Sequence, residues 1–198
     1  MKVINSNCHY RKKVTVTLHR KSIEKSAFIA PSQRKGMRYH LRRQDKEIKD
    51  PEKLKKILKE THYVTLALVK DGEPYLVSLS HAYDEAENCI YFHSASEGKK
   101  LDYMRGNPVV WGQALLDHGY HKGECSHLYA SVMFRGNIKF IEDTKSKRSV
   151  FRMMVNQIEP EPNSIMDRMV NSEGIPSTVV GRINIEYMTG KKSAEVTL

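Results

Sequence analysis

The sequence has few cysteines and no long hydrophobic run, and each shortage excludes a class of protein. Its 198 residues include three widely spaced cysteines, Cys8, Cys89 and Cys125, which excludes a disulfide scaffold and any CxxC zinc or redox motif. No apolar stretch approaches the roughly 18 residues that a membrane-spanning helix needs. Lys and Arg interrupt every apolar stretch near the N-terminus, so no signal peptide is predicted. We therefore expect a soluble protein of the reducing cytoplasm.

Positive charge is concentrated at the N-terminus. Residues 1–50 hold 14 of the 33 Lys and Arg and 4 of the 23 Asp and Glu, so the rest of the chain holds 19 of each sign. We expect residues 1–36 to be a basic, mostly disordered extension and residues 37–198 to form the folded domain. The extension could bind nucleic acid or an anionic surface. A solvated tail, or a stretch upstream of a start at Met37, fits better, because the basic residues lack regular clustering and interleaved aromatics.

Local patterns predict six strands and several helices. Asp50-Pro51-Glu52 is typical of a helix start and predicts an amphipathic helix that ends near residues 60–62. Asp71-Gly72 predicts a hairpin turn, and Gly136 a bulge. Strands are predicted at 63–69, 75–83, 89–93, 109–116, 128–141 and 179–188, and further helices at 99–105, 144–157 and 164–170.

The connections between these elements indicate the fold class. Turns of about five residues join the first three predicted strands, which is typical of an antiparallel meander. Residues 117–126 are expected to form a polar loop, Thr189-Gly190 to stop the last strand, and Trp111 to lie in the core. Six mostly hairpin-linked strands predict a mainly β protein with flanking helices, built as a small antiparallel barrel.

One strand-to-helix junction carries the residues of an anion site. His93-Ser94-Ala95-Ser96 ends a strand, and the next helix opens with Lys99 and Lys100. Free N–H groups at a helix start, serine hydroxyls and ammonium groups all bind phosphate oxygens. Lysines in a first helical turn oppose the helix dipole, a local cost that an anion would offset. The alternative is an ordinary helix with two solvated lysines.

Two further groups of residues could carry chemistry. The segment 117–127 contains three histidines, one cysteine and two acids, which are metal ligands in kind, but their spacing fits no zinc pattern and no metal site is predicted. An exposed polar loop is the simpler interpretation, and a Cys125–His127 nucleophilic pair lacks an orienting third group. His81 and His93 stand at strand ends, where a packed role is commoner than a catalytic one.

Five segments of the chain together carry a resemblance to a known family. They are Arg42–Ile48 before the Pro51 helix, Gly72–Leu79, Ile90–Asp102 with Asn107-Pro108, Tyr129–Val132 with Gly136 and Glu142-Asp143, and Glu186–Lys191. In this order they resemble the pyridoxamine 5′-phosphate oxidase-like FMN-binding split barrels, in the branch that contains the 5-nitroimidazole-resistance proteins. The resemblance covers about residues 38–192.

The resemblance implies a six-stranded antiparallel split β-barrel that forms a homodimer with FMN between the subunits. It implies an FMN-dependent oxidoreductase, reducing nitroimidazoles or another small acceptor, with His93 taking part near the reacting ligand. The cofactor-binding residues that it implies lie on the second strand, at the strand-to-helix junction and on two later strands: Val77, Ser78, Leu79, His93, Ser94, Ala95, Ser96, Lys99, Lys100, Gln113 and Ser131.

Differences from the family narrow the expected chemistry. Pyridoxamine-phosphate oxidases carry an arginine where this chain has Val77 and an Arg-Lys pair where it has Lys99-Lys100. Their C-terminal arginine motif for the substrate phosphate has no counterpart here, which argues against vitamin B6 oxidation. The alternative is a non-catalytic FMN- or haem-binding protein on the same scaffold, with His121 and His127 as haem ligands, or nucleic-acid binding through the N-terminus.

Overall fold

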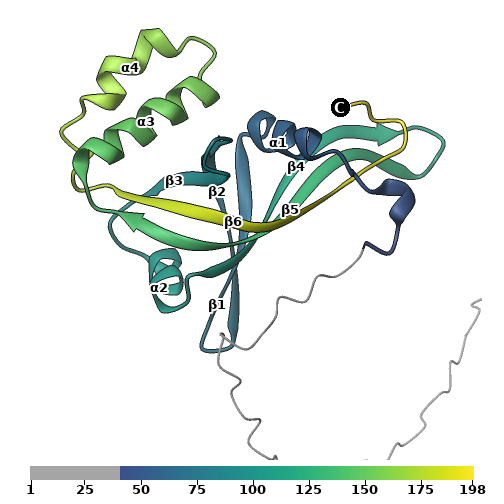
Figure 1. Cartoon of the computed structure of the whole chain (residues 1–198), viewed down its shortest axis with the longest axis horizontal. Helices are drawn as coiled ribbons and strands as arrows, with labels where there is room; N and C mark the ends of the chain where they lie inside the picture. Colours follow the sequence, from purple (N-terminus) through teal and green to yellow (C-terminus); the bar gives the residue numbers. More distant parts are fainter. Residues whose placement is uncertain (1–40) are drawn as a thin grey trace, which may run out of the picture. The chain divides into compact units, whose positions relative to one another are not determined.

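The computed structural model describes residues 41–198; the interpretation of residues 1–36 as a basic extension lies outside these residues. Six antiparallel strands close into a ring in the order β1-β2-β3-β6-β5-β4 (Figure 1). This confirms the prediction of a mainly β, six-stranded antiparallel barrel with flanking helices. The strands are β1 (Tyr63–Lys70), β2 (Glu73–Asp84), β3 (Cys89–Ser94), β4 (Val109–His121), β5 (Ser126–Ile141) and β6 (Val179–Lys192).

Local backbone geometry produces the predicted hairpin and the predicted bulge. Asp71 and Gly72 both have positive φ, 51° and 83°, which matches the twist of the β1–β2 hairpin. The register of β5 against β6 shifts between Arg135 and Gly136. A Cβ on Gly136 would lie 2.4 Å from the carbonyl oxygen of Asn184, so the close approach of the two strands requires glycine there.

Two phenylalanine rings fill the barrel interior by lying over glycines on neighbouring strands. Phe92 of β3 is paired with Gly181 of β6, and Phe134 of β5 with Gly112 of β4. A Cβ on either glycine would lie 2.1 Å from the ring opposite. Both rings are fully buried, so the glycines make room for the largest side chains of the core.

Two helices contribute side chains to this core. Helix α1 (Pro51–Glu60) begins as predicted, since the Asp50 carboxylate accepts a 3.0 Å hydrogen bond from the Glu52 backbone N–H. Its buried face joins the same hydrophobic cluster as Leu101 and Met104 of α2 (Lys99–Gly106). In Figure 1, α1 lies above the crossing strands and α2 below them. A 3₁₀ turn, η2 (Gln44–Lys46), precedes α1.

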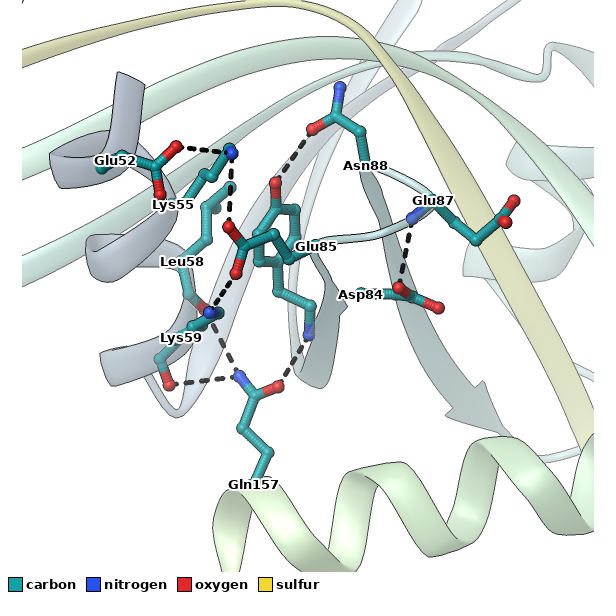
Figure 2. A network of polar contacts seen from close by, with 10 residues as sticks. Glu52, Lys55, Leu58, Lys59, Asp84, Glu85, Glu87, Asn88 and Gln157 are labelled. Carbon is teal, nitrogen blue, oxygen red and sulfur yellow. Dashed lines mark hydrogen bonds and ion pairs between the residues drawn. The ribbon is translucent and has the colours of Figure 1, made fainter. Parts of the chain in front are cut away.

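The other two helices, α3 (Thr144–Ile158) and α4 (Pro162–Val170), form a hairpin. Side chains of α3 form a second cluster with β3 and β6 residues, so α3 covers the outside of these strands. Gln157 joins α3 to the barrel (Figure 2): its Oε1 accepts from the Tyr83 N–H at 2.9 Å, and its Nε2 donates to the Lys59 carbonyl at 3.1 Å. Glu85, beside it, accepts from Lys55 at 3.2 Å and from Lys59.

Three sequence predictions are wrong. Residues 117–126 are mostly strand, because β4 and β5 continue their pairing to His121 and Ser126 after a register shift. Strand β6 runs through Thr189-Gly190: Gly190 pairs with Val132, and Leu54 of α1 occupies the space that a Cβ would need. Trp111 is 37% exposed, since its position in β4 places it on the outside of the barrel. In residues 41–198, no helix has the length and apolarity to cross a membrane.

Candidate functional site

The N-terminus of α2 has unused hydrogen-bond donors. Gly98 precedes the helix with φ 124° and ψ 164°, a conformation essentially restricted to glycine. Its carbonyl oxygen accepts from the N–H groups of Leu101 at 2.9 Å and Asp102 at 3.3 Å. Within residues 41–198, the N–H groups of Lys99 and Lys100 have no acceptor. This helix start therefore offers free donors and the positive end of the helix dipole, the features on which the predicted anion site depends.

Ser94, at the end of β3, has a hydroxyl group that the protein itself leaves unused. The residue is 5% exposed, and its Oγ has no hydrogen-bond partner among the described residues. A buried hydroxyl without a partner destabilises a protein, because it loses its hydrogen bonds to water and gains none in return. Ala95 and Ser96, which follow it, are exposed. Four residues separate Ser94 from the first residue of α2, so this hydroxyl is a candidate second donor to the same anion.

The two lysines of α2 form no ion pair in the described part of the chain. Among residues 41–198, no carboxylate lies within ion-pair distance of Lys99 or Lys100. The Nζ of Lys99 instead lies over two rings, 4.8 Å from the centroid of Tyr75 and 5.4 Å from that of Tyr103. Neither tyrosine is among the site residues predicted from the sequence. Tyr103 could have been found from its position four residues after Lys99, whereas Tyr75 comes from β2 and depends on tertiary structure.

A second group of predicted residues lies on the outer face, which we define as the solvent side of β1, β2, β4 and β5. Ser78, Thr65 and Gln113 are consecutive across three strands, and Met133 follows on β5. The hydroxyls of Thr65 and Ser78 are 2.9 Å apart and hydrogen bonded. Ser131 lies two residues before Met133, so its side chain is on the same side of β5, but it is buried, with 7% of its surface exposed. The structure thus places Ser78 and Gln113 at this surface, with Ser131 covered on the same side of the sheet.

Val77 and Leu79 point away from this surface. They alternate with Ser78 along β2 and pack against the hydrophobic core of the barrel. Of the three β2 residues that the resemblance implies, Ser78 alone has its side chain on the outer face. Val77 and Leu79 can reach a ligand on that face through their backbone only.

His93 stands near the edge of the outer face. It is one position beyond the His81–Phe92 pair of β2 and β3, which places it beside the exposed Ser80. Its ring packs 5.3 Å from the ring of Phe151 on α3 while another side remains open to solvent. Partial burial lowers the pKa of His93 from its ordinary value. His93 is therefore mostly neutral at pH 7 and can donate or accept one hydrogen bond.

His81 is a packed residue. Its side chain is fully buried, and its Nε2 donates to the Leu58 carbonyl oxygen at 2.9 Å. Burial lowers the pKa of His81, as expected for an imidazole removed from water. This position belongs to the packing between β2 and α1.

The histidine-rich hairpin does not gather its side chains around one point. His127 pairs with Tyr120, and their rings are 5.5 Å apart. His121 is the next residue after Tyr120, so its side chain points to the opposite face of the hairpin. The two histidines of one chain therefore do not converge on a single haem iron. Among residues 41–198, no three His, Cys, Asp or Glu side chains are placed to hold a metal ion.

Comparisons with known proteins relate this fold to flavin-binding proteins. Over 73% of this chain and 85% of the other, it is 26% identical to a candidate 5-nitroimidazole antibiotic resistance protein from Bacteroides thetaiotaomicron, with a TM-score of 0.61. A FAD-binding protein from Mesorhizobium loti is also 26% identical over 73% of this chain and 96% of that one, with a TM-score of 0.53. A flavocytochrome from Azotobacter vinelandii, 20% identical with a TM-score of 0.67 over 81% of this chain and 75% of that one, shares the fold.

A comparison of the sequence with curated proteins gave no match. The sequence profile of the pyridoxamine 5′-phosphate oxidases matches residues 50–192, which span the six strands and the four α-helices of the described residues. With the closed antiparallel barrel in agreement, the chain belongs to the pyridoxamine 5′-phosphate oxidase family.

Proposed function

We propose that the chain binds FMN and is an FMN-dependent oxidoreductase that reduces a nitro compound or another small acceptor. The observation that carries the proposal is the set of unused donors between Ser94 and Lys100. A phosphate monoester would accept hydrogen bonds from the Ser94 hydroxyl and from the Lys99 and Lys100 N–H groups. The two ammonium groups would balance its charge. These residues fit the phosphate end of FMN.

The outer face would receive the flavin ring and a second copy of the chain. Of the seven large hydrophobic side chains that are exposed in residues 41–198, six lie there: Tyr63, Val69, Leu76, Trp111, Leu115 and Met133. A surface that exposes several large apolar side chains is typical of a protein interface. Ser78 and Gln113, in the middle of it, would supply the few polar contacts that orient a flat ligand. We infer that the protein is a homodimer with its cofactor at the interface.

When bound, FMN would supply the hydride and electron transfer chemistry, and the protein would hold and orient its reacting ring. His93 is the side chain best placed to contact an acceptor, because it lies at the edge of the outer face and is open to solvent. With its lowered pKa it would be neutral at pH 7, and it would exchange a proton or hydrogen bond through one ring nitrogen.

The test is an absorption spectrum of the purified protein before and after denaturation, followed by titration with FMN. A flavin band, or saturable uptake of FMN, supports the proposal, whereas a haem spectrum or no uptake of FMN overturns it. Turnover is measured next, with a nicotinamide reductant and a nitroimidazole. Steady reduction of the nitroimidazole would support the proposal that the protein is an enzyme. Flavin binding without turnover with any nitro acceptor would leave a flavin-binding protein.

A further inference from the structure

Lys99, at the first position of α2, has its ammonium group against two neighbouring aromatic rings. The rings of Tyr75 and Tyr103 are 5.2 Å apart with an angle of 55° between their planes, and the Lys99 Nζ lies within 5.4 Å of both centroids. Tyr103 is one helical turn after Lys99, whereas Tyr75 comes from β2. The ammonium group is thus fixed relative to the sheet as well as to its own helix.

This arrangement differs from that of the lysines of α1. Lys55 and Lys59 both lie against the Glu85 carboxylate, and Lys55 also pairs with Glu52, so two carboxylates balance the two ammonium groups. A ring face attracts a cation through its quadrupole but carries no net charge and accepts no strong hydrogen bond. No carboxylate of residues 41–198 therefore balances the Lys99 ammonium group, and its three N–H donors are open to another acceptor.

We propose that Tyr75 and Tyr103 are positioning residues that hold the Lys99 ammonium ready for the phosphate monoester of the flavin. This inference rests on the proposed function and extends it, because it assigns the selectivity for a phosphorylated flavin to a Tyr–Lys–Tyr cluster. Fixing the ammonium group in advance removes part of the entropy that a free lysine side chain would lose on binding. The cluster should favour FMN over riboflavin and leave contacts with the ring unchanged.

We test the inference at Tyr75, because Tyr103 is largely buried in the core and its substitution could disturb folding. The full chain and its Tyr75→Phe and Tyr75→Leu variants are titrated with FMN and, separately, with riboflavin, by flavin fluorescence. Tyr75→Phe keeps a ring face under the ammonium group, so its Kd for FMN should stay within about twofold. Tyr75→Leu removes one ring and should raise the Kd for FMN about two- to fivefold, the size of one exposed cation–π contact. The Kd for riboflavin should not change.

A Lys99→Met background separates positioning from a structural role of Tyr75. In that background Tyr75→Leu should have no further effect on FMN binding, because the group it positions is gone. Thermal unfolding of each variant checks folding. Three results would overturn the inference while the wild type still binds FMN. Tyr75→Leu could weaken the binding of FMN and of riboflavin equally, or it could leave FMN binding unchanged. Its effect on the Kd for FMN could also be fully additive with that of Lys99→Met. If the wild type binds neither flavin, the proposed function fails first and this inference falls with it.

Discussion

The imidazole of His81 donates its Nε2 proton to the carbonyl oxygen of Leu58, 2.9 Å away, and so joins β2 to the last turn of α1. Its other nitrogen, Nδ1, is buried without a partner among the described residues. A second proton on this ring would leave a charge in the core with no acceptor at Nδ1, and this is why burial lowers the pKa of His81.

The first prediction is therefore a loss of stability in mild acid. The unfolded chain takes up a proton at His81 near pH 6.5, whereas the native protein does so only at lower pH. Unfolding is then favoured as pH falls below about 6.5, by at most about 1.4 kcal/mol per pH unit for one proton. Urea unfolding from pH 8 to pH 5 measures the slope.

The His81→Gln variant provides the control for this prediction, because it keeps a donor but cannot take up a proton in this range. Its slope between pH 7 and pH 5 should be smaller than that of the wild type. His93, whose pKa is also lowered, contributes a slope of the same sign in both proteins. Equal slopes in the two proteins would show that His81 is not the group responsible.

The second prediction concerns Gly181 beneath the Phe92 ring. A methyl group in Gly181→Ala would lie 2.1 Å from the ring, so the ring or the strand must shift. We expect a loss of about 1–3 kcal/mol in the free energy of unfolding. Gly174→Ala is the matched control, since the nearest atom to its Cβ would be 3.5 Å away, and it should be nearly neutral. Adding Phe92→Leu to Gly181→Ala should recover part of the loss.

The third prediction separates binding from stability at Ser94. Because its Oγ has no partner, Ser94→Ala should leave the thermal stability of the ligand-free protein unchanged or slightly higher. If the hydroxyl binds the flavin phosphate, the same change should weaken FMN binding by about 0.5–1.5 kcal/mol and leave riboflavin binding alone. Ser149→Ala, an exposed serine of α3, is the control. A drop in stability without a change in FMN affinity would assign Ser94 a structural role.

The fourth prediction tests the outer face as a dimer interface. Leu115→Glu puts a charge among the exposed apolar side chains and should shift the protein from dimer to monomer in sedimentation velocity. FMN affinity should fall in parallel if the cofactor lies between the subunits. Asn156→Glu adds the same charge to an exposed position of α3 and should stay dimeric. A wild type that sediments as a monomer would contradict the interface itself.

Much of the fold could be predicted because local signals agreed with tertiary structure. Asp50 and Pro51 start α1, Asp71-Gly72 turns the first hairpin, and Gly136 marks the register shift. The extended hairpin at Asp117–His121 could not be predicted from alternation, because both of its faces are polar and solvated. The end of β6 was missed because Gly190 is required by the side chain of Leu54, from a segment far away in the sequence.

The candidate site also combines features that local sequence predicts with features that depend on tertiary structure. The helix start at Lys99 and the serines before it could be predicted from the types of residue in this segment and their order. Which of Val77, Ser78 and Leu79 faces outward depends on the register of β2 against β1, and one residue of slip would exchange the faces. The unused hydroxyl of Ser94 and the contact of Tyr75 with Lys99 depend on how β2 and β3 lie against α2, which no local pattern encodes.

The order of the strands around the ring has a consequence for synthesis. β6 lies between β3 and β5, yet it follows both in the sequence. Until the ribosome has released that segment, β3 and β5 each expose a row of unpaired backbone groups that could add to another nascent chain. The barrel can therefore close only after translation of β6, and stalling before residue 179 would leave an aggregation-prone intermediate.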